Sequence, residues 1–312
     1  MPSRRHELLA RAVPRIRGSR ELDSLEEERA RLTRWHTTLG HELPTRLVPR
    51  FGRRFHLVRE TLRGEGPEFT SWVFAPRRSA PSRTIYYLHG GGFVAPIDPF
   101  HVRYAARLAE TLGARVVMPD YPLAPEHTWE ASHQALAQDL RRWAETGPVT
   151  LAGDSAGGGL ALALAVTLAR DSGDAAALPD SLLLLSPWVD LAESTPETAA
   201  LDAVDPWLSL SKLRAYAAWW AGTPDDLGRT EVSPALAPRE VLGRLPRTLV
   251  FCGTRDVLQP GCRMLATRGA GTGWPLTYVE EPDLIHVYPL LPGIPEAARA
   301  HRTVLDFLRR PA

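Results

Sequence analysis

Short apolar runs alternate with helical segments from residue 83 onward, and this alternation limits the fold more than any other feature of the chain. The strand-like runs are residues 85–88, 115–118, 149–152, 182–185, 248–251 and 275–279, and the helical segments are 102–112, 129–143, 155 onward and 295–309. Strands that alternate with helices pair in parallel through right-handed crossovers. Runs without period-two alternation are typical of strands covered on both faces. We therefore predict an α/β fold with a mostly parallel sheet and helices on both faces.

The segments outside this alternation are equally informative. Ser24 and Glu27 form a capping-box pattern, which predicts an amphipathic helix over residues 24–39. Residues 55–62 and 69–74 are β-rich and flank a Gly-Pro-containing turn, so we expect an antiparallel hairpin leading into the sheet. Between residues 190 and 246 the alternation lapses into a Trp-, Ala- and Pro-rich insertion with a helix over 211–220.

Charge and cysteine content exclude several classes of protein. The 37 Lys and Arg residues nearly balance 36 Asp and Glu residues, so no strong field attracts nucleic acid or anionic lipid. The two cysteines, Cys252 and Cys262, are too few for a secreted disulfide scaffold, which favours a reduced, cytoplasmic setting. We see no signal-peptide core and no apolar stretch of about 18 residues, so we expect no stable membrane insertion. The sequence leaves a homodimer open.

The strongest chemical signal is Gly153-Asp154-Ser155-Ala156-Gly157, a G-x-S-x-G placed between the strand-like run 149–152 and the helix that follows. In this context the motif is typical of a sharp turn that lifts a nucleophilic serine above the sheet of an α/β-hydrolase. Small flanking residues let the neighbouring backbone approach. We therefore predict Ser155 as the nucleophile.

A second glycine motif, His89-Gly90-Gly91-Gly92, follows the strand-like run 85–88. Glycines leave backbone amides unshielded, and amides directed into a cleft stabilise the oxyanion of a tetrahedral intermediate. We expect Gly91, Gly92 and Ala156 to supply these amides. His89 precedes the serine, the wrong order for the base in this architecture, so we assign it a structural role.

A serine hydroxyl needs a histidine to accept its proton and an acid to orient that histidine. In α/β-hydrolases the acid and then the histidine follow the serine along the chain. Asp256 lies just after the strand-like run 248–251, and His286 follows the run 275–279. We predict Asp256 as the acid and His286 as the base, and we expect His301, in the last helix, to be solvated. The acidic alternatives close to His286 are Glu280, Glu281 and Asp283, which we expect in a solvated loop.

Taken together, these motifs resemble the hormone-sensitive lipase family of bacterial carboxylesterases. The resemblance covers about residues 84–288 and includes His89 to Phe93, Asp120 to Glu126, Gly153 to Gly158, Ser186 to Asp190, and the loops of Asp256 and His286. It implies an α/β-hydrolase fold with an eight-stranded, mostly parallel sheet and a helical cap. The implied division is N-terminal cap helices at 1–48, core at 49–190, a cap insertion at 191–245 and core again at 246–312. Asp154 and the segment Asp120 to Glu126 are then supporting residues.

The resemblance implies a serine carboxylesterase that hydrolyses short- to medium-chain acyl esters through an acyl-enzyme intermediate. The triad and oxyanion hole need only protein groups, so we expect no cofactor, and the histidines show no metal-ligand spacing. A lactonase, amidase or formamidase with the same triad remains an alternative. A binding protein that has lost the histidine is disfavoured because His286 is present. The residues Trp188, Trp207, Trp219 and Trp220 either line the substrate pocket or pack the cap.

Overall fold

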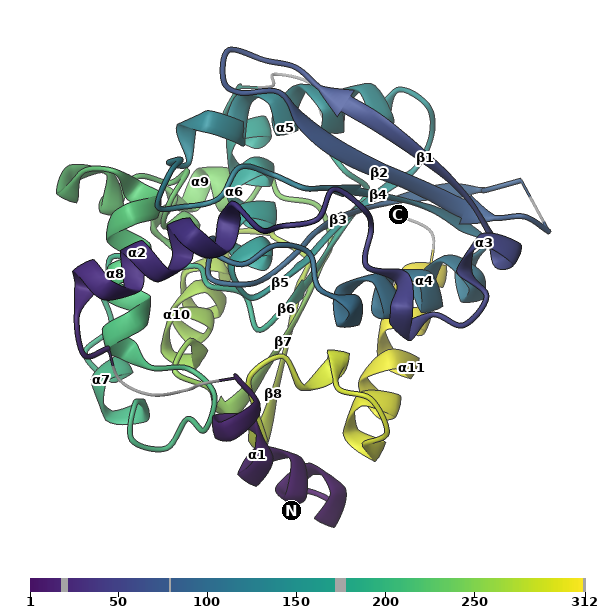
Figure 1. Cartoon of the computed structure of the whole chain (residues 1–312). Helices are drawn as coiled ribbons and strands as arrows, with labels where there is room; N and C mark the ends of the chain where they lie inside the picture. Colours follow the sequence, from purple (N-terminus) through teal and green to yellow (C-terminus); the bar gives the residue numbers. More distant parts are fainter. Residues whose placement is uncertain (18–21, 79, 172–177, 311–312) are drawn as a thin grey trace.

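The computed structural model describes residues 1–17, 22–78, 80–171 and 178–310 (Figure 1). Its strands are β1 (Phe55–Leu62), β2 (Phe69–Pro76), β3 (Arg83–Leu88), β4 (Ala114–Pro119), β5 (Val149–Asp154), β6 (Ser181–Leu185), β7 (Thr248–Arg255) and β8 (Leu276–Ile285). Its α-helices are α1 (Arg4–Arg17), α2 (Leu25–His36), α3 (Phe51–Arg54), α4 (Pro99–Leu112), α5 (Glu130–Ala144), α6 (Ser155–Asp171), α7 (Thr198–Leu201), α8 (Leu210–Ala221), α9 (Arg239–Leu242), α10 (Gln259–Gly269) and α11 (Pro295–Arg309).

All eight strands form one sheet in the order β1-β2-β4-β3-β5-β6-β7-β8. Strands β1 and β2 form the expected antiparallel hairpin, and β2 pairs antiparallel with β4. Every pair from β4 to β8 is parallel. The prediction of a mostly parallel eight-stranded sheet is confirmed, and the loops that follow the parallel strands emerge at the same edge of the sheet.

The sheet is covered on both faces, which explains why its central strands have no polar side. Successive residues of β3 face opposite cores: Tyr86 packs in one cluster and Ile85 and Tyr87 in the other. Helices α5, α6 and α10 contribute to the first cluster, whereas α4 and α11 contribute to the second. These two groups of helices lie on opposite sides of the sheet (Figure 1).

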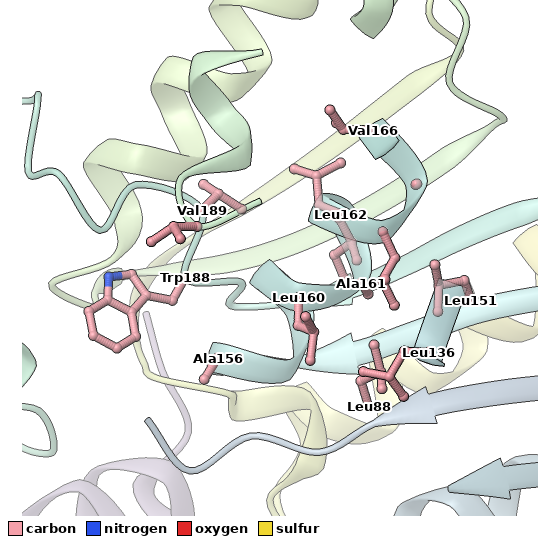
Figure 2. Packing of buried hydrophobic residues seen from close by; sticks show 14 of the residues in the cluster. Leu88, Leu136, Leu151, Ala156, Leu160, Ala161, Leu162, Val166, Trp188 and Val189 are labelled. Carbon is pink, nitrogen blue, oxygen red and sulfur yellow. The ribbon is translucent and has the colours of Figure 1, made fainter. Parts of the chain in front are cut away.

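Helix α6 is the central helix of the first layer and is buried from Ser155 to Ala169. A helix that is apolar all round is stable only when it is surrounded by protein. Leu160 and Leu162 on α6 pack near Leu88 and Leu151 of the sheet and near Val189 (Figure 2). This packing fixes the start of α6, and therefore Ser155, relative to β3 and β5.

The N-terminal region and the insertion pack together, although they are far apart in the sequence. Ser24 caps α2 by accepting a hydrogen bond from the Glu27 amide at 3.3 Å, as the capping-box pattern predicts. The Tyr216 hydroxyl on α8 donates to Glu28 on α2 at 2.5 Å. Figure 1 shows α2 beside α8. The division into cap and core at 1–48, 49–190, 191–245 and 246–312 stays a prediction, and it includes residues 18–21, 172–177 and 311–312, outside the described residues.

Helix α1 was not among the helices expected from local pattern, although the resemblance implied N-terminal cap helices within residues 1–48. Buried His6 accepts a hydrogen bond from the amide of Ile285 at 3.2 Å, and Glu7 pairs with Arg255 at 3.3 Å. Burial lowers the pKa of His6, which favours the neutral imidazole that this contact requires. The helix therefore braces the ends of β7 and β8 through contacts that the local sequence does not reveal.

Two local predictions are wrong. The last strand does not end at Val279 but continues to Ile285, because β8 stays paired with β7 past Gly253. His301 is not solvated: it is buried against Tyr104 with the rings 6.5 Å apart, and burial lowers its pKa to about 4. The apolar face of α11 is thus wider than its sequence pattern suggested.

Candidate active site

Ser155 occupies a strained turn between β5 and α6. Its backbone φ is 53°, in the left-handed region that non-glycine residues rarely adopt. Such strain persists only where the surrounding packing imposes it, and it is concentrated at functional sites. The turn leaves the Ser155 side chain 8 % exposed at the edge where the parallel strands end.

The glycines on either side of Ser155 are required by close backbone approach. A Cβ at Gly157 would lie 2.2 Å from the carbonyl oxygen of Leu88 and 2.3 Å from that of His89. A Cβ at Gly153 would lie 2.4 Å from the carbonyl oxygen of Gly157. The G-x-S-x-G pattern therefore has a steric cause in this fold: β3, β5 and α6 meet at distances that exclude side chains.

His286 lies between Ser155 and Asp256. The Ser155 Oγ is 2.9 Å from His286 Nε2, and His286 Nδ1 is 2.9 Å from Asp256 Oδ2. Asp256 is fully buried and His286 is 2 % exposed. A neutral imidazole with the proton on Nδ1 donates to Asp256 and accepts from the serine hydroxyl, as a general base requires. The three residues that the sequence singled out are thus within hydrogen-bonding distance of one another.

The surroundings of His286 favour its positive charge. Burial alone would lower the pKa of the imidazole, but the charge and hydrogen bond of Asp256, with the charges of Asp205 and Asp154, outweigh this and raise the pKa. Asp256 is itself held by the amide of Leu258, which donates to its Oδ1 at 3.0 Å. The site is arranged to stabilise the imidazolium that forms when the histidine accepts a proton.

The loop after β3 brings three glycines beside Ser155. The Gly90 amide donates to Asp154 Oδ1 at 3.2 Å, and Gly91 and Gly92 have φ angles of 117° and 63°. Within the described part of the chain, no hydrogen bond uses the amide of Gly91, Gly92 or Ala156 as a donor. These amides meet the chemical requirement for oxyanion donors.

Replacing Gly91 by alanine should lower the kcat of acyl transfer at this site by about 10²-fold, the loss expected when one oxyanion donor is weakened. The new Cβ would lie 2.8 Å from the Cβ of Ala95 and 2.9 Å from its carbonyl oxygen, so the loop must shift and redirect its amides. Steady-state kinetics test this. Gly40→Ala is the matched control because a Cβ there meets nothing within 4 Å. Equal kcat values for the two variants would contradict the role of the loop.

A buried polar network centred on Asp154 supports this loop. Asp154 accepts from the Tyr87 hydroxyl at 2.7 Å and lies 3.4 Å from the His101 imidazole. Burial alone would raise the pKa of Asp154, but His101 and Tyr87 outweigh it and lower the pKa. In the described structure no hydrogen bond joins His89 to Ser155. The His89 ring stacks on that of Tyr121 with the centroids 4.3 Å apart, and burial lowers the pKa of His89 to about 3. These contacts fit supporting roles for both residues.

The acidic alternatives near His286 are engaged elsewhere. Glu280 pairs with Arg263 at 2.6 Å, and Glu281 pairs with Arg299 at 2.9 Å. Asp283 is exposed, with a φ of 60°, and its amide donates to the Thr254 hydroxyl. The expectation of a loop is wrong for all three residues, which lie in β8, and only Asp283 is as exposed as expected. None of the three carboxylates has a hydrogen bond to the imidazole in the described structure.

Aromatic side chains from the insertion, together with Trp188 just before it, pack around the glycine loop and His286. Trp220 stacks on Phe93 with the ring centroids 4.2 Å apart, and Trp188 stacks on the same ring at 5.8 Å. Trp207 meets the His286 imidazole edge to face at 5.6 Å. The tryptophan-rich insertion therefore contributes directly to the walls of the site, whereas Trp219 contacts Tyr216 within α8.

Two residues beside the triad escaped the sequence reading. The Cys252 thiol lies 3.6 Å from Asp256 Oδ2, and burial raises its pKa well above the usual range, so it acts as a donor. Asp205 lies in the insertion and accepts three backbone amides, including that of Val257. In the sequence Asp205 is only an aspartate before a proline, and this pattern does not indicate its contact with Val257. In residues 1–17, 22–78, 80–171 and 178–310, no group of three His, Cys, Asp or Glu side chains is arranged to hold a metal ion.

Comparison with known proteins agrees with this architecture. Residues 85–290 match a protein family described as the alpha/beta hydrolase fold. An acetyl-hydrolase of Streptomyces hygroscopicus is 34 % identical over 244 residues, which span 76 % of this chain and 78 % of that protein. The esterase LipU of Mycobacterium tuberculosis is 30 % identical over 237 residues, 73 % of this chain and 77 % of its own.

A solved structure, described as an esterase from the bacterial hormone-sensitive lipase family, superposes with a TM-score of 0.76. It is 24 % identical, and the match covers 99 % of each chain. At this identity the likeness shows the fold. Among the described residues, no helix has the length and apolar character needed to cross a membrane.

Proposed function

Because the chain belongs to the α/β-hydrolase fold family, with bacterial esterases of the hormone-sensitive lipase family among its neighbours, we propose that it hydrolyses carboxylic esters of short to medium acyl chain length. The observation that carries the proposal is the continuous hydrogen-bonded line from Ser155 through His286 to Asp256, with 2.9 Å at each step. This is the arrangement that turns a serine hydroxyl into a nucleophile. The same line beside unengaged glycine amides supplies every group that acyl transfer needs.

In the proposed reaction, the Ser155 Oγ attacks the ester carbonyl carbon while its proton passes to His286 Nε2. The amides of Gly91, Gly92 and Ala156 hold the oxyanion of the tetrahedral intermediate. The imidazolium, stabilised by Asp256, then gives its proton to the departing alkoxide as the carbon–oxygen bond breaks. A water molecule repeats these steps on the acyl-enzyme, and Ser155 regains its proton as the acid leaves.

The packed aromatic wall supports a preference for small acyl groups. Phe93 and Trp220 are almost fully buried and stack with 5° between their ring planes, and Trp188 donates its amide to the carbonyl of Ser155 at 2.8 Å. Space beside the nucleophile is thus bounded by rigid rings. The similarity to an acetyl-hydrolase points in the same direction.

A series of p-nitrophenyl esters tests the substrate class. We expect kcat/KM to be highest for acyl chains of about two to eight carbons and to fall for longer chains that the aromatic wall excludes. Parallel assays on aryl amides and lactones test the alternative acyl compounds. Higher kcat/KM for an amide or lactone than for every ester in the series would contradict the proposal.

A further inference from the structure

Asp205 links the cap insertion to the acid loop through a single carboxylate. Its Oδ1 accepts hydrogen bonds from the amides of Trp207 at 2.7 Å and Leu208 at 3.1 Å. Its Oδ2 accepts from the amide of Val257 at 2.9 Å. Asp205 is only 9 % exposed, so these three bonds replace the hydration of a charge that is almost completely buried.

Two of the three residues whose amides bond this carboxylate adjoin the triad. Val257 follows Asp256 directly, and the next amide, that of Leu258, donates to Asp256 Oδ1. Trp207 packs edge-on against the imidazole of His286, with the ring planes at 86°. One side chain therefore orders the segment that contacts the base and the turn that carries the acid.

The charge of Asp205 also acts on the imidazole. Burial and the neighbouring charge of Asp256 raise the pKa of Asp205 to about 6, and its negative charge is among those that raise the pKa of His286. The charged groups that act on His286 are Asp256 from the loop after β7, Asp154 from the serine turn and Asp205 from the insertion, and the Cys252 thiol of β7 contacts Asp256. His6 of α1 accepts a hydrogen bond from the amide of Ile285, which precedes His286, and Glu7 pairs with Arg255, which precedes Asp256. Asp205 is the member of this set that the cap contributes.

We propose that Asp205 is a positioning residue of the hydrolytic reaction, which fixes the acid loop and holds Trp207 against His286 so that cap and triad assemble as one unit. This inference rests on the triad proposed above. It assigns the insertion a part in the chemistry in addition to its contribution to the pocket walls. The substrate does not touch Asp205; the residue acts through Val257, Trp207 and the imidazole.

An asparagine at this position cannot replace the carboxylate. It has one acceptor oxygen, so its amide group would face either the Val257 amide or the Trp207 and Leu208 amides, donor against donor. It is also neutral, so the imidazolium of His286 loses one favourable charge. Asp205→Asn therefore removes the link and the charge while keeping the shape of the side chain.

The matched control is Asp202→Asn. Asp202 lies three residues earlier in the same segment and also accepts a backbone amide, that of Leu210 at 2.6 Å, at the start of α8. This hydrogen bond joins Asp202 to the first residue of α8 and involves neither Val257 nor Trp207. The two substitutions change the charge equally, so a difference between them reports the position of Asp205.

The test measures kcat, KM and the pH dependence of kcat/KM for p-nitrophenyl acetate with both variants and with the unaltered enzyme. For Asp205→Asn we expect kcat to fall by about 10- to 100-fold with little change in KM, because misplaced catalytic groups cost rate and leave binding largely intact. The acid limb of the kcat/KM profile should move to lower pH by about half a unit or more, since the imidazolium is less stabilised. Asp202→Asn should keep both values.

Equal kcat and equal acid limbs for the two variants would overturn the proposal. So would a loss of kcat in Asp205→Asn with an unmoved acid limb, which would make the residue structural only. If the asparagine variant does not fold, as judged by circular dichroism, Asp205→Ser is measured instead, because a hydroxyl can still accept the Trp207 amide; failure of both to fold would also count against the proposal. Ser155→Ala, assayed alongside, separates the outcomes, since hydrolysis that persists there contradicts the proposed function itself.

Discussion

Replacing Ser155 by alanine should lower kcat for p-nitrophenyl acetate by about 10⁶-fold, the loss typical of a serine nucleophile removed from an intact triad. In the proposed mechanism the Ser155 Oγ attacks the ester, and this oxygen is 2.9 Å from the His286 Nε2 that would accept its proton. Without it the imidazole has no nucleophile to activate, and only the oxyanion donors and substrate binding remain. The variant should also resist labelling by a fluorophosphonate, which reacts with activated serines.

The matched control for this substitution is Ser132→Ala. Ser132 is also almost fully buried, on α5, and its hydroxyl has no hydrogen-bond partner in the described structure. Loss of that hydroxyl should leave hydrolysis and labelling at the level of the unaltered enzyme. Stopped-assay detection of p-nitrophenol and gel-based labelling measure both. Hydrolysis or labelling that persists in Ser155→Ala would refute the assignment of Ser155 as the nucleophile.

Replacing Asp256 by asparagine should lower kcat by about 10⁴-fold while the fold stays intact. An asparagine amide group facing His286 Nδ1 favours the tautomer with its proton on Nε2, and that nitrogen can then no longer accept the serine proton. The effect is large because Asp256 is fully buried and 2.9 Å from the imidazole, so no water substitutes for its carboxylate. Single-turnover and steady-state kinetics give the size of the loss.

Asp283→Asn serves as its control. Asp283 is close to His286 in sequence, yet its side chain is exposed and its φ of 60° is one that asparagine adopts readily. The substitution should change kcat by less than about twofold, as expected for a surface change without lost contacts. If Asp283→Asn were the damaging variant and Asp256→Asn the mild one, the acid would have been assigned to the wrong loop.

The parts of this fold that were predictable are those set by local pattern. The alternation of apolar runs with helical segments predicted the parallel sheet, because a strand covered on both faces has no solvent-exposed side, as β6 illustrates with five buried residues in succession. The glycines beside Ser155 were also recognisable, because the G-x-S-x-G motif is short and lies between a strand-like run and a helix, although the carbonyls that exclude a Cβ at Gly157 belong to the distant residues Leu88 and His89. His286 and Asp256 followed from their places after strands.

The rest depended on contacts between distant segments. Helix α1 packs through His6 against residue 285, and nothing in its basic, proline-containing sequence indicates that partner. The sequence around Asp205 gives no sign of its contact with the Val257 amide, which exists only in the folded chain. His301 has the sequence context of a surface histidine, and only the packing of α11 against α4 buries it. Such assignments need three-dimensional proximity.

Ser155 and His286, the proposed nucleophile and base, are separated by 131 positions along the chain, whereas His286 and the proposed acid, Asp256, are separated by 30. Contacts of such sequence separation form late, after the entropy of closing a long loop has been overcome. During synthesis on the ribosome, the serine turn emerges well before the polypeptide that carries the imidazole. In the proposed mechanism hydrolysis requires residue 286, so nascent chains that stop before it can acquire helices and a partial sheet without attacking esters.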